Sequence, residues 1–153
     1  MQAGGSQTRS VQFLTAAVSP ETGPGGIGVV ALNVCPTEPA GVYEQAIGTS
    51  EELLYTAVLR ALQLGKRLGA SEVTVFCPDE MVVKQINREL RIVTGGRLAL
   101  LYIKVKALMY RFESARVVTA SRSKVSAARK LALAASRIPV PKKESPRTLF
   151  TTV

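Results

Sequence analysis

The sequence predicts a single α/β domain: a five-stranded mixed sheet of three antiparallel and two parallel strands, flanked by helices. Two observations predict this class. Three strand-like segments joined by short turns come first, which is typical of an antiparallel meander. Strand-like and helical segments then alternate, and strands joined by helical crossovers pair in parallel. At 153 residues the chain is long enough to bury a core of its own.

The predicted meander occupies the first third of the chain. Its strands are "SVQFLTAAV" at 10–18, "IGVVALN" at 27–33 and "VYEQAIG" at 42–48. Two segments rich in Pro and Gly, "SPETGPGG" and "VCPTEPAG", separate them, and such segments favour turns. We therefore expect three adjacent antiparallel strands.

The pattern then changes from strand to helix period. Thr49 or Ser50 is a candidate N-cap, two glutamates occupy the next turn, apolar residues recur at helical spacing, and Gly69 ends the segment. The remaining predicted elements are a strand at 72–76, helices at 79–90 and 97–112, a strand at 115–120 and a helix at 124–138.

These elements define the expected domain organisation. We expect a mobile lead at 1–9, one domain at 10–138 and an extended, basic, proline-containing tail at 139–153. The first residues lack the apolar stretch of a signal peptide, and Lys104 and Lys106 interrupt the longest apolar segment. We therefore expect a cytoplasmic protein without a membrane span, with an organelle matrix as the alternative location.

Charge divides the chain into two unequal parts. The net charge is +9, yet residues 1–83 carry four basic and eight acidic side chains. Residues 84–147 carry sixteen basic and three acidic ones. Such polarity predicts one positive face and a polyanionic partner, and a lysine-rich solvated surface is the alternative.

Cysteine and histidine usage excludes several kinds of site. Cys35 and Cys77 fit neither a zinc-binding nor a redox spacing, so reduced thiols are expected. The chain has no histidine, the commonest general base and transition-metal ligand. The sequence therefore predicts no cofactor.

Several short strings carry a resemblance to the type 1 ribonuclease H family, in its compact bacterial and reverse-transcriptase-like branch. It covers roughly residues 11–136. The strings are "GPGGIGVV" at 23–30, Tyr55 with "LGA" at 68–70, "VVKQIN" at 82–87 and "AARKLA" at 127–132. Each alone is weak, but they occur in the family's order and spacing. The resemblance implies a ribonuclease H-like fold.

The same resemblance implies that the family's catalytic site is absent. Its four metal-binding carboxylates align with Ala16, Leu54, Pro78 and Arg129. In the family these acids hold two magnesium ions, which activate a water and stabilise the leaving oxygen. Glu52 lies about 200° around the helix from Leu54, and Asp79 comes one position late. We therefore expect no catalytic residues, no metal and no nuclease activity.

The basic half is expected to bind nucleic acid. A surface that accepts a duplex through its backbone is implied by the resemblance, and Ser121 to Lys124 resemble a phosphate site beside a helix start. The candidate binding residues are Lys84, Arg88, Arg91, Arg97, Lys104, Arg122, Lys124, Arg129 and Lys130. We expect an inactive ribonuclease H-like protein that binds RNA or an RNA–DNA hybrid, with a role in a larger ribonucleoprotein, where the basic segment 137–147 would follow RNA.

A protein-interaction or dimerisation module without nucleic-acid binding is the alternative. Its candidate surface is the apolar stripe Leu98, Leu101, Val105, Leu108 and Met109. Packing against the protein's own core is the favoured role for this stripe.

Overall fold

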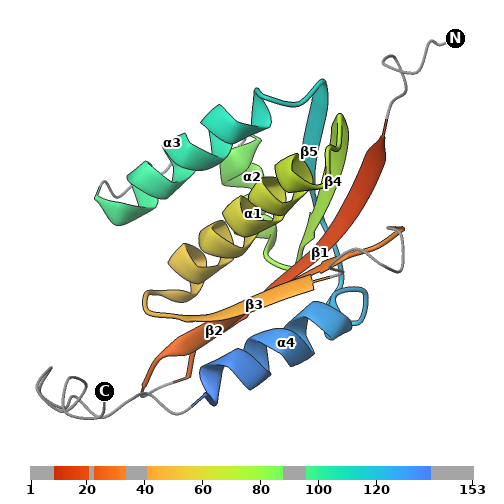
Figure 1. The fold of residues 1–153 in the computed structure, drawn as a ribbon. Helices are drawn as coiled ribbons and strands as arrows, with labels where there is room; N and C mark the ends of the chain where they lie inside the picture. Colours follow the sequence, from red (N-terminus) through yellow and green to blue (C-terminus); the bar gives the residue numbers. More distant parts are fainter. Residues whose placement is uncertain (1–8, 21–22, 34–40, 88–95, 139–153) are drawn as a thin grey trace, which may run out of the picture.

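The structure is a computed structural model that describes residues 9–20, 23–33, 41–87 and 96–138. The predicted tail at 139–153 and all but Arg9 of the predicted lead lie outside these residues. Nine elements follow the predicted order of strands and helices (Figure 1). They are β1 (Ser10–Val18), β2 (Gly25–Ala31), β3 (Gly41–Ala46), α1 (Ser50–Arg67), β4 (Glu72–Cys77), α2 (Glu80–Ile86), α3 (Arg97–Met109), β5 (Ser114–Thr119) and α4 (Ser126–Ser136).

The five strands form one mixed sheet in the order β3-β2-β1-β4-β5. β1 pairs antiparallel with β2, and β2 with β3, as a meander requires. β4 pairs in parallel with both β1 and β5. The predicted sheet of three antiparallel and two parallel strands is therefore confirmed.

Several element ends differ from the predicted ones by a few residues. β2 begins two residues early, at Gly25, because the backbone of this glycine already pairs with Ala46 of β3. α3 ends at Met109, three residues early, because the next amides bond back over three residues, as from Arg111 to Leu108. The helix predicted at 79–90 begins at Glu80 and ends at Ile86, with Asp79 and Asn87 as its caps, and residues 88–90 lie outside the described residues.

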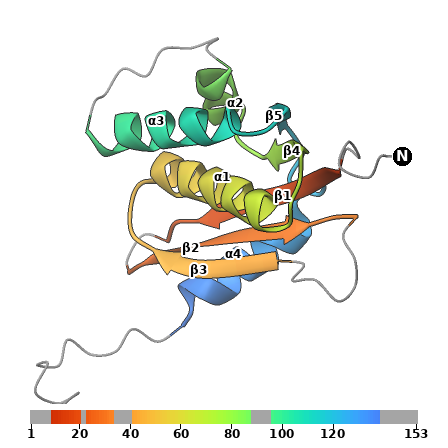
Figure 2. The ribbon, with the colours of Figure 1, turned by 45° about the horizontal axis from the view of Figure 1, so that its top comes forward.

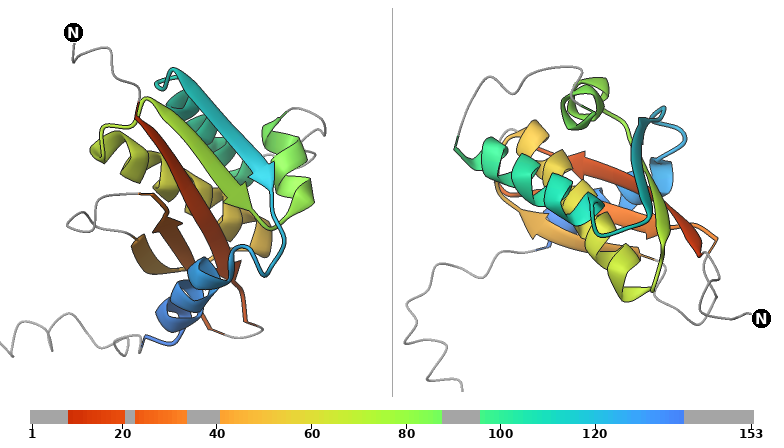
Figure 3. Two further views of the ribbon diagram at one scale, coloured as in Figure 1. Left: turned by 90° about the vertical axis from the view of Figure 1, so that its right-hand side faces the viewer. Right: turned by 90° about the horizontal axis from the view of Figure 1, so that it is seen from above.

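Helices cover both faces of the sheet. α1 lies on one face with α2 and α3 on its side, and α4 lies alone on the other (Figures 2 and 3). The larger core cluster contains Phe13, Val58 and Leu62 and fills the α1 face. A smaller cluster of Leu14, Ala16, Val125 and Ala128 fills the α4 face. Because successive residues of β1 point to opposite faces, one strand serves both clusters.

Two glycines of the string at 23–30 allow α4 to lie close to β2. A Cβ atom at Gly26 would overlap the carbonyl oxygen of Ala132, and one at Gly28 would overlap that of Ala128. The contact face of α4 is also made of small residues, including Ala128, Ala132 and Ala135, all fully buried. The glycines thus set the position of the helix that carries Arg129.

Two other residues of the resembling strings form a buried polar contact. The Tyr55 hydroxyl on α1 donates to Oε1 of Gln85 on α2, at 2.8 Å. Burial raises the pKa of Tyr55 above its usual value. The pair satisfies two polar groups that would otherwise be costly in the core, and it joins α2 to α1.

The favoured role of the predicted α3 stripe is confirmed. Leu98 and Val105 are buried, and Leu101, Leu108 and Met109 pack against the larger core cluster.

None of the helices in the described part of the chain combines the length and the apolar character that a membrane span needs.

Candidate functional site

A pocket of about 380 Å³ opens at the carboxyl ends of β1 and β4. Four parts of the fold line it: the end of β1, the first turns of α1, the residues after β4, and the turn and helix that follow β5. Its lining residues are Ala16, Ala17, Ser50, Leu54, Pro78, Asp79, Glu80, Arg122, Val125 and Arg129.

All four positions that the resemblance equates with metal-binding acids lie in this one pocket. Ala16 comes from β1, Leu54 from α1, Pro78 from the residue after β4, and Arg129 from α4. Ala16 and Leu54 are buried and form an apolar wall, whereas Arg129 is exposed. The chemistry at these positions is therefore apolar and cationic.

The acids nearest the pocket have structural partners. Asp79 is the N-cap of α2, and its carboxylate accepts from the amides of Met81, at 2.8 Å, and Val82. Glu52 and Thr49 form a reciprocal capping box at the start of α1. Within the described ranges, no group of three or more Asp, Glu, His or Cys could hold a metal ion.

Glu80 is the remaining acid at the pocket, and it faces a cation of its own helix. Its carboxylate lies 3.3 Å from Nζ of Lys84, one turn later on α2. This exposed pair partly neutralises both groups. Lys84, a predicted binding residue, is therefore already paired with an acid.

Two arginines supply the positive charge of the pocket. Arg122 lies in the turn after β5 and Arg129 one turn into α4. Both residues are exposed, and neither side chain makes a hydrogen bond or ion pair with another described residue. Two guanidinium groups at one pocket form a site suited to an oxyanion, since each offers several donors in a planar fork.

The turn that carries Arg122 is held by its serines. The Ser121 hydroxyl accepts from the amide of Lys124 at 3.2 Å and lies 3.1 Å from the Ser123 hydroxyl. The Lys124 ammonium lies over the Phe76 ring, 4.7 Å from its centroid. These contacts fix the loop between β5 and α4, so Arg122 is presented on an ordered turn.

The other predicted binding residues do not line this pocket. Lys130 is exposed next to Arg129 on α4. Arg97 donates to the carbonyl of Ile47 and lines a separate pocket with it. Lys104 lies in a groove between α1 and α3. Arg88 and Arg91 lie outside the described residues.

Sequence reasoning missed the contribution of Ser50 to the pocket. Ser50 is the first residue of α1, directly after the N-cap Thr49. The available signal is the Thr-Ser pair at the predicted helix start, which indicates a helix cap and does not indicate a pocket. Ser50 thus lines the same pocket as the two arginines and brings a hydroxyl-bearing side chain to it.

Thr15 of β1 and Cys77 of β4 are buried near the pocket, and neither side chain is available for chemistry there. The Thr15 hydroxyl donates to the carbonyl of Phe76 at 2.7 Å, which joins β1 to β4. Burial raises the pKa of the Cys77 thiol to about 12, so this thiol is neutral and unreactive at neutral pH.

Comparison with known proteins assigns the chain to a family. The fold is that of a ribonuclease H-like domain. Residues 14–135 match the family described as Reverse transcriptase-like, and the chain belongs to this family. No curated protein sequence matches the chain.

Solved ribonucleases H share the architecture at low sequence identity. The N-terminal RNase H domain of a Mycobacterium tuberculosis protein superposes with a TM-score of 0.75 at 23% identity, covering 84% of this chain and 94% of that one. RNase H1 from Halobacterium salinarum gives 0.75 at 19%, covering 82% and 96%. LC11-RNase H1, of compost metagenomic origin and solved with an RNA/DNA hybrid, gives 0.73 at 22%, also covering 82% and 96%.

Proposed function

We propose that this protein is a catalytically inactive ribonuclease H-like protein that binds RNA or an RNA–DNA hybrid through its phosphates. One observation carries the proposal. Arg122 and Arg129 line the same pocket as Ala16, Leu54 and Pro78, the positions that the resemblance assigns to metal-binding acids. A divalent cation needs oxygen ligands and is repelled by a guanidinium, so these residues do not fit the family's metal pair.

The same residues fit a phosphate. The resemblance implies that, in active members of the family, divalent cations supply the positive charge that a phosphate meets at this place in the fold. Here Arg122 and Arg129 would supply that charge, and Ser50 lines the same pocket. LC11-RNase H1 was solved with an RNA/DNA hybrid. A duplex of that kind is therefore the first ligand to test.

The proposed contact surface extends from the pocket along α4. Lys124 and Lys130 flank the two arginines in sequence and are exposed. No acid occurs in the first turn of α4. Arg97 and Lys104 stay predictions without support from this pocket, as do Arg88 and Arg91.

The experiment is a fluorescence-anisotropy titration at several salt concentrations. Its ligands are an RNA–DNA hybrid, double-stranded RNA and single-stranded RNA. The variant neutralises Arg122, Lys124 and Arg129 together by alanine. We expect the variant to bind more weakly. The slope of the logarithm of its binding constant against the logarithm of salt concentration should become shallower, by roughly 0.7 to 0.9 for each lost phosphate contact.

Lys66→Ala is the matched control, because Lys66 is an exposed cation in the last turn of α1, outside the pocket. Its binding should equal that of the wild type. Failure of the wild type to bind all three ligands at low salt would contradict the proposal. An unchanged salt slope in the triple variant would move the binding surface elsewhere, with the segment 137–147 as the next candidate.

A further inference from the structure

A second surface, independent of the pocket, lies on the outer side of α3. Leu100, Ile103, Ala107 and Tyr110 are exposed and follow one another at spacings of three, four and three residues. At about 100° per residue they fall within an arc of about 80°. We call these four residues the α3 outer stripe. It lies on the side of the helix opposite Leu98 and Val105, which face the core.

The exposure of this stripe is unusual for large apolar side chains. Leu100, Ile103 and Tyr110 retain 58%, 59% and 76% of their accessible surface. Single exposed apolar residues are ordinary, but a row at helical spacing is typical of an interface. Its three-four spacing is the one by which two helices pack along a seam.

A row of cations borders the stripe. Arg97 and Lys104 lie about 60° and 40° around the helix from Leu100, and Arg111 follows just after the helix end. α3 contains no Asp or Glu, so nothing within the helix neutralises this row. The row runs along the side of the outer stripe that is nearer to α1.

A groove between α1 and α3 continues this surface. It has a volume of about 420 Å³, and its lining includes the apolar side chains of Leu59 and Leu108. Lys104 and Arg111 also line it, and Ala107 belongs to both the groove and the outer stripe. The apolar and cationic parts therefore form one continuous surface.

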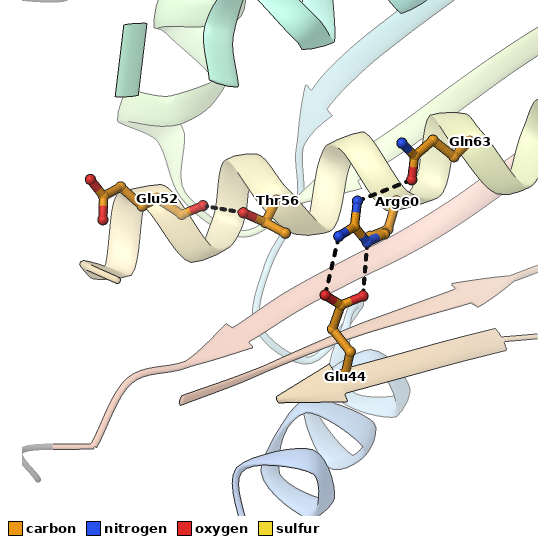
Figure 4. Close-up of polar contacts among 5 residues, drawn as sticks. All are labelled: Glu44, Glu52, Thr56, Arg60 and Gln63. Carbon is orange, nitrogen blue, oxygen red and sulfur yellow. Dashed lines mark hydrogen bonds and ion pairs between the residues drawn. The ribbon is translucent and has the colours of Figure 1, made fainter. Parts of the chain in front are cut away.

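The third cation of the groove is already neutralised. Arg60 of α1 forms a bidentate ion pair with Glu44 of β3, through contacts of 2.8 and 3.2 Å, and also donates to Gln63 (Figure 4). Lys104 and Arg111 have no ion-pair partner among the described residues. These two are thus the charges available to a ligand.

We propose that the α3 outer stripe and its cationic row bind an amphipathic helix of another protein, one with an apolar stripe and a flanking row of Asp or Glu. The helical spacing selects a helix as the occupant, and the charge row selects an acidic one. In a pair formed with a second copy, the cationic row would face no acid of α3. A phosphate backbone would leave the leucine and isoleucine unburied, and a flat bilayer would leave the groove unfilled.

Position-specific photo-crosslinking in the protein's native cells tests this inference. A benzoylphenylalanine replaces Leu100 in the full chain, and in the control it replaces Met81, a half-exposed apolar residue on α2. Mass spectrometry identifies the linked peptide. We expect the Leu100 position, and not Met81, to link to a segment of another protein with apolar residues at helical spacing and acidic neighbours.

Charge reversal supplies the decisive comparison. Lys104→Glu with Arg111→Glu should reduce the yield of that adduct at least fivefold. A synthetic peptide of the linked segment should bind the reversed protein at least tenfold more weakly, and replacing its acids by Lys should restore binding. The triple variant at Arg122, Lys124 and Arg129 should crosslink normally, so this test is independent of nucleic-acid binding.

Three outcomes would overturn the inference. They are adducts formed with a second copy, with nucleic acid or with lipid in place of another protein, adduct yields unaffected by charge reversal, and equal yields from Leu100 and Met81. Circular dichroism of each variant verifies that the fold is retained, since all substituted side chains are exposed or half-exposed.

Discussion

Gly28 is the residue at which the packing of α4 is most directly testable. Replacing it by Ala places a Cβ against the carbonyl of Ala128, a backbone atom that moves only with the whole helix. We expect Gly28→Ala to reduce the free energy of unfolding by about 1–3 kcal/mol, the usual cost of overpacking. Urea denaturation followed by circular dichroism measures this loss.

Ala127→Val is the control for that substitution, because Ala127 lies on the exposed side of the same helix. It should cost no more than the difference in helix propensity, up to about 0.7 kcal/mol. Equal urea midpoints for Gly28→Ala and the wild type would show that α4 does not lie as close to β2 as described.

Cys77 gives the protein a predicted loss of stability in alkali. Burial raises its pKa from 9.0 to about 12 in the folded state, so the unfolded thiol releases its proton first. This contribution to stability is complete below about pH 9 and falls as the pH rises toward 12, by up to about 1.4 kcal/mol per pH unit. Comparing wild type with Cys77→Ala between about pH 8 and pH 11 isolates it. Parallel pH profiles would contradict the assignment.

At the scale of elements, Asp79 links the pocket to the start of α2. Its carboxylate caps the helix, so Asp79→Ala should reduce the free energy of unfolding by about 1 kcal/mol. Asp79→Asn keeps an acceptor and should cost much less. Thermal unfolding of the two variants measures the difference. A loss that is the same for Ala and Asn would mean that charge, and not capping, is what this residue contributes.

The elements themselves were largely predictable because their local signals agree with the fold. Thr49 and Glu52 form a capping box that the sequence indicates directly, and it starts α1 as expected. The ends of elements were less predictable. The early start of β2 depends on pairing with β3, and the early end of α3 depends on a tight turn, and both are set by neighbours rather than by the segment itself.

The candidate site was predictable only in part. The strings that resemble the family indicated Ala16, Leu54, Pro78 and Arg129, and the structure gathers these residues around one pocket. The grouping of the basic residues was not available from charge counts, which do not say which face a residue occupies. Arg129 lies on α4 and Lys104 on α3, and these two helices cover opposite faces of the sheet. The basic half therefore forms at least two separate surfaces.

At the scale of the whole molecule, the proposal predicts a protein that divalent metals neither stabilise nor activate. A metal ion that binds only the folded state raises the melting temperature of the protein. We expect Mg²⁺ and Mn²⁺ to leave that temperature unchanged, and an RNA–DNA hybrid to remain intact, because the pocket offers an apolar wall and two guanidinium groups. Differential scanning calorimetry and a gel assay measure the two quantities.

The control for this prediction introduces the acids that the resemblance assigns to these four positions. The variant carries four substitutions together: Ala16→Asp, Leu54→Glu, Pro78→Asp and Arg129→Asp. Its melting temperature should increase when Mn²⁺ is added, because four carboxylates then converge on the pocket. Protein for these assays must come from a host lacking its own ribonuclease H. If the wild type cleaves the hybrid, and Asp79→Asn or Glu52→Gln abolishes the cleavage, the protein is an enzyme with relocated acids and the proposed function is wrong.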